Sequence, residues 1–115
     1  MNRRMLMGLL LLAATGLTRA DESYRVDVQV YDNGRLVAAP VMMVAGGKQA
    51  SLSLGDDFSL SLLVEQSDAG QSLDVASQLA LNGENYTPRM RVRAGKESAI
   101  GIGNMRMFIK VTAAP

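Results

Sequence analysis

Residues 40–56 read PVMMVAGGKQASLSLGD, and residues 88–104 read PRMRVRAGKESAIGIGN. Aligned at a constant offset, the two stretches share six of their seventeen residues, where average residue usage would give about one. The sequence therefore predicts a unit that occurs twice in the chain. Two copies indicate a duplication within one domain, because a solenoid needs at least three repeats.

The start of the first unit has the pattern of a β-hairpin. Val26, Val28 and Val30 alternate with polar residues, which is the two-residue period of a half-buried strand. Asn33 and Gly34 follow, and this pair is the strongest short hairpin signal, because both residues tolerate the positive φ of a type I′ turn.

A proline lies inside the next apolar run of each unit. Pro40 has no amide proton to donate, so this strand is predicted to be an edge strand there or to carry a bulge. Turns at Gly47 and Gly55 then separate two further strands. With one-residue gaps allowed, residues 26–28 also align with residues 73–75.

The chain is therefore predicted to be all-β, a small sandwich or barrel of about eight antiparallel strands formed by two repeated four-strand units. The first unit covers about residues 24–66, a linker covers residues 67–71, and the second unit covers about residues 72–112.

Residues 1–20 have the three parts of a cleavable signal peptide. Two arginines near the start precede an apolar stretch over residues 5–17, and Thr18-Arg19-Ala20 ends the segment. The apolar stretch is shorter than the about 20 residues of a membrane span, although a retained anchor helix is the alternative. We expect cleavage after Ala20, which leaves residues 21–115 as a single β domain without a membrane span, in the periplasm or secreted.

Composition argues against several classes of function. Cleavage removes three of the twelve basic residues, so nine basic residues face eleven acidic ones, and this balance disfavours nucleic-acid binding. The chain has no His and no Cys, which removes the usual general base, the thiolate nucleophile and most zinc or iron ligand sets. Asp56 and Asp57 are assigned to turn chemistry. We therefore expect no enzyme activity and no cofactor.

Five methionines follow the signal peptide, and thioether sulfur favours Cu(I). They are Met42, Met43, Met90, Met105 and Met107. Methionine also fills gaps in apolar cores, and the alternation of these residues with others favours a core. The residues expected to be buried together are Met42, Met90, Met105, Met107, Val28, Leu52, Ile102 and Ile109. A Met-based copper site is the alternative.

Arginines and apolar residues alternate at the start of the second copy of the repeated stretch. In a strand, Arg89, Arg91 and Arg93 lie on one face, while Val41 and Met43 hold two of the equivalent positions in the first unit. The arginines form either a solvated face that discourages edge pairing or a docking strip for an acidic partner. An apolar second face needs cover from this domain or from a partner. All five residues are therefore candidates for contact with a protein partner.

One short pattern resembles a known family. Its residues are Ala39, Pro40, Val44, Gly47, Ala50, Leu52, Leu54, Gly55 and Asp56. The pattern resembles the Pro-led β-hairpin segment of bacterial secretins, the ring-forming channels of the outer membrane. The resemblance implies a hairpin architecture and an envelope setting, and it brings no catalytic residue.

Together these features predict an exported, non-enzymatic β domain that acts through contact with a protein partner in the cell envelope. An accessory role in an envelope or secretion assembly fits the resemblance. Two alternatives stay open: a periplasmic copper-handling protein that uses the methionines, and a small inhibitor of an exported hydrolase.

Overall fold

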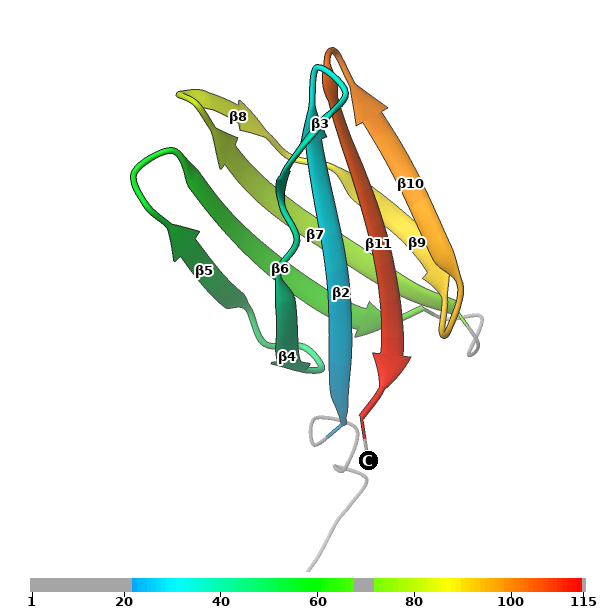
Figure 1. Cartoon of the computed structure of the whole chain (residues 1–115). Helices are drawn as coiled ribbons and strands as arrows, with labels where there is room; N and C mark the ends of the chain where they lie inside the picture. Colours follow the sequence, from blue (N-terminus) through cyan, green and yellow to red (C-terminus); the bar gives the residue numbers. More distant parts are fainter. Residues whose placement is uncertain (1–21, 68–71, 115) are drawn as a thin grey trace, which may run out of the picture.

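The computed structural model describes residues 22–67 and 72–114, so the predicted signal peptide lies outside the described residues. Within these ranges the fold is all-β, as predicted, with two antiparallel sheets of five strands each. The sheets pack face to face as a small sandwich (Figure 1). The described ranges contain no helix suited to crossing a membrane.

The described residues form ten strands. The first half contributes β2 (Ser23–Asp32), β3 (Arg35–Ala38), β4 (Val41–Ala45), β5 (Ala50–Leu54) and β6 (Phe58–Gln66). The second half contributes β7 (Ser72–Leu81), β8 (Glu84–Tyr86), β9 (Arg89–Arg93), β10 (Glu97–Ile102) and β11 (Met105–Ala113).

The number exceeds the predicted eight because a proline divides one edge strand in each half. Pro40 separates β3 from β4, and Pro88 separates β8 from β9. Neither proline has an amide proton, but each carbonyl still accepts a hydrogen bond from the neighbouring long strand: Pro40 from Val28 at 2.9 Å, and Pro88 from Ser77 at 3.0 Å. These hydrogen bonds keep the interrupted strand attached to its sheet.

The two halves are interleaved between the sheets. Sheet 1 has the order β10-β11-β2-β3, with β4 also paired to β2, and sheet 2 has the order β5-β6-β7-β8, with β9 also paired to β7. Each half begins in one sheet and ends in the other, and the strands of the two sheets cross obliquely (Figure 1). The chain changes sheets between β4 and β5, and again between β9 and β10. The two halves therefore share one core.

Matching backbone hydrogen bonds occur at the two sheet crossings. The amide of Gly47 donates to the carbonyl of Val64 at 2.9 Å, and the amide of Gly95 donates to the carbonyl of Val111 at 2.7 Å. Both glycines have a positive φ, 76° and 82°. The two turns thus close equivalent corners at opposite sides of the sandwich, as two copies of one unit would do.

The two long hairpins match as well. Asn33 and Gly34 have φ values of 54° and 79°, and the pair Asn82 and Gly83 has values of 52° and 85°, so both hairpins have the positive φ at both turn residues that a type I′ turn requires. The hairpin predicted from the sequence was the one at Asn33 and Gly34, and the turn at Asn82 and Gly83 is its counterpart.

The strand register corrects one part of the sequence alignment. Val26 pairs with Met42 and Val75 pairs with Met90, so Val26 is equivalent to Val75. The alignment of residues 26–28 with residues 73–75 is therefore wrong by two residues. A two-residue slip leaves every side chain on its original face, which is why the hydrophobic pattern could not detect it.

The first half has one residue more than the second half between its long first strand and its proline, and a bulge accounts for this extra residue. Val30 pairs with Ala38 and Tyr31 pairs with Leu36, so Val37 is an extra residue in β3. The register of β8 shows no such shift. One extra residue in one strand of a pair defines a β-bulge, and the prediction of an edge strand or a bulge at this run is confirmed on both counts.

The core consists of the inward-facing residues of the long strands. The largest fully buried side chains are Leu60, Leu62, Leu79, Met105, Met107, Ile109, Val26, Val28, Val30, Val64, Val75 and Val111. Burial of a Val, Leu, Ile or Met side chain contributes about 1.5–3 kcal/mol. Aliphatic and methionine packing thus supplies the stability that aromatic residues or disulfides supply elsewhere.

Candidate functional site

The matched halves provide an internal comparison for the outer faces of the sandwich. Apart from Val37 in the bulge, each outward-facing position of the paired strands in sheet 1 has an equivalent in sheet 2, defined by the strand registers. A residue type that occurs on only one of the two outer faces is therefore not required by the backbone fold. Such residues are the candidates for function.

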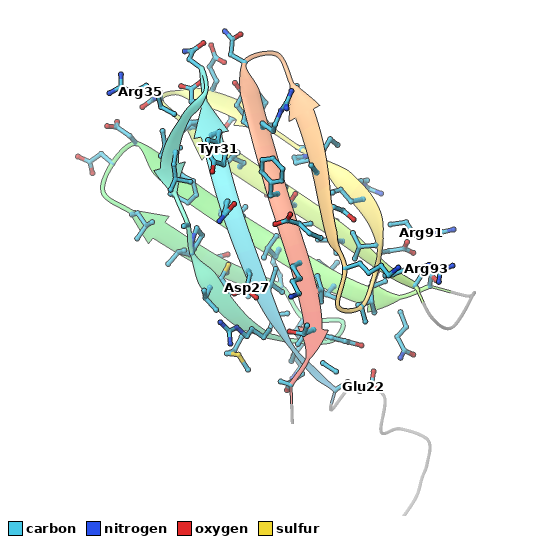
Figure 2. All side chains as sticks on the ribbon, turned by 45° about the vertical axis from the view of Figure 1, so that its right-hand side comes forward. Glu22, Asp27, Tyr31, Arg35, Arg91 and Arg93 are labelled. Carbon is cyan, nitrogen blue, oxygen red and sulfur yellow. The ribbon has the colours of Figure 1, made fainter. Side chains whose placement is uncertain are left out.

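The predicted arginine ladder is exposed on β9. Arg89, Arg91 and Arg93 face solvent, and Val92 between them is buried, so the predicted alternation is confirmed. Figure 2 shows Arg91 and Arg93 at the edge of sheet 2. The Nε of Arg91 donates to Oδ1 of Asp74 on the neighbouring strand at 2.9 Å. Part of the ladder's charge is thus balanced within the sheet.

Exposed apolar side chains gather on β3 and β4. Four of the six large hydrophobic residues that are exposed among the described residues lie there: Leu36 (52% exposed), Val37 (45%), Val41 (55%) and Met43 (62%). We call these four residues the apolar strip. The expectation that Val41 and Met43 present an apolar outer surface is confirmed, and no described part of the chain covers it.

The equivalent strands of the second half, β8 and β9, have polar residues at their outward-facing positions. The positions equivalent to Leu36, Val41 and Met43 carry Asn85, Arg89 and Arg91. The backbone is the same on both sides, so the fold accepts amide or guanidinium side chains at these positions. The apolar strip is therefore not a requirement of folding.

The strip and the ladder do not form one surface. β4 contacts β5 at one side of the sandwich, and β9 contacts β10 at the other (Figure 1). The five residues predicted to contact a partner thus divide into an apolar group and a basic group on opposite edges. A partner therefore cannot contact both groups through one small surface of its own.

The methionines divide between the core and the surface. Met105 and Met107 are fully buried and Met42 is buried, but Met90 is only half-buried. Met43 points outward as part of the apolar strip. The five sulfurs therefore do not share one surface. Groups of three or more carboxylates placed to hold a metal ion are absent from the described residues.

Two further residues that were expected in the core are less buried than predicted. Leu52 on β5 is half-buried, and Ile102 is 37% exposed, so the expectation that Ile102 is buried is wrong. Ile102 is the last residue of edge strand β10, beside the turn at Gly103. A side chain at the end of an edge strand has no neighbouring strand on one side to cover it.

A third feature was not predicted. Tyr31 on β2 and Phe108 on β11 meet edge to face, with ring centroids 5.7 Å apart and an interplanar angle of 76°. Figure 2 shows Tyr31 on the exposed face of sheet 1. A pocket of about 570 Å³ opens beside these rings, over Gly101 and Gly103. The available signal was that both rings lie in the outward phase of strands whose inward residues are apolar.

Two other groups of polar residues make local contacts. Asp56 and Asp57 lie in the turn between β5 and β6, as assigned, and the carbonyl of Asp57 accepts a hydrogen bond from Asn82 at 2.9 Å. The Tyr86 hydroxyl donates to Oε1 of Glu84 at 2.8 Å, and this hydrogen bond raises the pKa of Tyr86 above its ordinary value.

Comparisons with protein-family models, with curated proteins and with solved structures find no match to this chain. The secretin resemblance of residues 39–56 therefore stays a prediction. A proposal for the function therefore has to be argued from the residues exposed on the outer faces of the sandwich.

Proposed function

We propose that this chain is an exported, non-enzymatic β domain that acts by protein–protein contact in the cell envelope, as an accessory factor of an envelope or secretion assembly. The apolar strip is its contact surface. The observation that supports the proposal is the exposure of Leu36, Val37, Val41 and Met43, at strands whose equivalents in the same chain are polar.

Exposed apolar side chains that lie next to one another mark contact surfaces in soluble proteins. Folding gives no reason for the strip, since Arg89 and Arg91 occupy the equivalent positions of Val41 and Met43. Contact with a partner would remove these side chains from water, and it would do so without disturbing the core.

The strip is suited to side-chain contact more than to strand addition. Pro40 interrupts the edge between β3 and β4, and the bulge at Val37 disturbs the register next to it. Both features hinder a partner strand from pairing along the whole edge. The expected occupant is therefore an apolar segment of an envelope protein that packs over the side chains.

The arginine ladder has a different role in this proposal. Arg91 is paired with Asp74, and charged residues along an edge strand discourage pairing with other chains. The ladder then protects the β9 edge, while the strip makes the contact.

A double substitution, Val41→Arg with Met43→Glu, is expected to abolish partner capture. Val41 pairs with Asp27 and Met43 pairs with Arg25 on β2, so each new charge meets an opposite charge across the strand pair, which favours the folded sheet. Affinity capture from the native envelope with the tagged chain, before and after the substitution, measures the effect.

The matched control replaces Arg89, Arg91 and Arg93 by Ser. Its stability should change by no more than about 1–2 kcal/mol, and it should capture the same partner as the parent chain. Capture that survives the strip substitution but is lost, in a salt-dependent way, with the arginines would reverse the two assignments. A dimer of the parent chain that dissociates on the strip substitution would identify a second copy as the occupant, and would contradict the envelope partner.

Export has its own test. N-terminal sequencing of the exported protein should begin at Asp21, because cleavage after Ala20 removes the basic and apolar leader. A sequence that begins at Met1 in a periplasmic fraction would contradict the signal peptide.

A further inference from the structure

The pocket on sheet 1 has features that neither the fold nor the apolar strip explains. It lies on the outer face over β2, β10 and β11, beside the edge-to-face pair Tyr31 and Phe108. Its volume of about 570 Å³ is within the range of small-ligand sites. We call it the aromatic pocket.

Three positions of the equivalent surface of sheet 2 carry small residues. Tyr31, Arg106 and Phe108 correspond to Ala80, Ser59 and Ser61. Ser61 and Ser51 share a hydrogen bond of 2.9 Å between their hydroxyls, so these two hydroxyls satisfy each other. The same backbone therefore folds without the aromatic pair, and folding does not account for the rings on sheet 1.

Gly101 keeps the floor of the aromatic pocket low. Its φ is not positive, and a Cβ added there would lie 3.7 Å from the Met105 carbonyl oxygen, which is an ordinary contact. The equivalent residue in sheet 2 is Ser53. Backbone geometry thus does not require glycine at this position, although glycine weakens a strand. A glycine inside a strand often marks a place where a ligand approaches the backbone closely.

The polar side chains around the rings indicate what the ligand presents. Glu97, Arg106 and Gln29 line the pocket, and none of them has a side-chain hydrogen bond or ion pair to another described residue. Arginine only donates, a carboxylate only accepts, and an amide does both. A hydroxyl group both donates and accepts, so one polyhydroxyl ligand could pair with all three.

The charges and the aromatic rings around the pocket further restrict the chemical class of the ligand. One cationic and one anionic side chain line the pocket, so a neutral ligand meets no excess of either sign. Tyr31 and Phe108 offer apolar surface beside the polar groups. A pyranose ring combines an apolar C–H face with a rim of hydroxyls, and it matches this division.

We propose that the aromatic pocket binds a neutral glycan, with a sugar ring against Tyr31 and Phe108 and its hydroxyls paired with Glu97, Arg106 and Gln29. The approach of the sugar needs the space that Gly101 leaves open. This site does not depend on the protein contact proposed for the apolar strip, because none of the four strip residues lines the pocket, although Leu36 pairs with Tyr31 on the same outer face.

The test is an amide NMR titration of the exported chain with cellotetraose and with chitotetraose. At least one of these neutral oligosaccharides should shift the amides of Tyr31, Gly101 and Phe108 in a saturable way. Tetragalacturonate, which carries a carboxylate on every ring, should bind more weakly. The absence of shifts at these residues up to about 10 mM of both neutral sugars, or tighter binding of the acidic one, would overturn the proposal.

Two variants test whether the ligand binds in the aromatic pocket. Gly101→Leu fills the pocket and Phe108→Ser introduces the residue type of the equivalent position in sheet 2, so each should weaken the affinity by about tenfold or more. Ser53→Leu is the matched control on sheet 2 and should leave the affinity unchanged. If Gly101→Leu perturbs the fold, the Phe108→Ser result decides. Binding that survives Phe108→Ser would contradict the assignment of the ligand to the aromatic pocket.

Discussion

Replacing Met107 by Ala is expected to lower the free energy of unfolding by about 2–5 kcal/mol. Met107 is fully buried in the middle of β11, where it pairs with Val30 on one side and Ile100 on the other. Truncation removes buried apolar surface and leaves a cavity that the two sheets cannot fill without moving closer together. Urea unfolding, followed by circular dichroism, measures the change in the midpoint at a constant slope.

Met43→Ala is the matched control, since the same substitution is made on the outer face of β4. Met43 is 62% exposed, so its removal should change stability by less than about 0.5 kcal/mol. Equal losses for the two variants would contradict the assignment of one methionine to the core and the other to the surface. If Met107→Ala kept its stability but lost Cu(I) binding, the copper alternative would replace the core assignment.

Gly95→Val is expected to cost about 1–3 kcal/mol. Gly95 has a φ of 82° at the turn where the chain passes from sheet 2 to sheet 1, and a β-branched residue strongly disfavours this conformation. The turn is also held by the hydrogen bond from its amide to the Val111 carbonyl. Relief of the strain would therefore loosen the connection between the sheets.

Gly101→Ser separates this effect from the general cost of replacing glycine. Gly101 lies in a strand without a positive φ, and Ser53 already holds the equivalent position in sheet 2. Its substitution should leave the free energy of unfolding unchanged or slightly higher. Urea unfolding of the two variants side by side gives the comparison, and a larger loss for Gly101→Ser would contradict the assigned turn geometry.

The sequence predicted the local features of the fold well. The alternation of Val26, Val28 and Val30 with polar residues gives the inward face of β2 directly, because strands have a period of two. Asn33 and Gly34 mark the hairpin, and the effect of Pro40 on an edge strand follows from its missing amide proton. Each of these inferences uses residues that are close together in the chain.

The features that could not be predicted depend on strands that are distant in the sequence. Phe108 lies beside Gln29 and Tyr31 only because β11 pairs with β2 in one particular register. Neither the aromatic pocket nor the pair of Arg91 with Asp74 follows from a periodic pattern within one strand. The separation of the ladder from the apolar strip likewise follows from the exchange of strands between the sheets.

Every equivalence between the two halves depends on the register that pairs β2 with β11 and β6 with β7. Nuclear Overhauser contacts between backbone protons across these strand pairs test it most directly, because paired residues of antiparallel strands lie about 4.5–5.5 Å apart at their Cα atoms. Contacts are expected between Val28 and Ile109 and between Leu62 and Ser77. Contacts that join β2 to β6, or that are displaced by one residue along either pair, would contradict the interleaved sandwich and the functional surfaces derived from it.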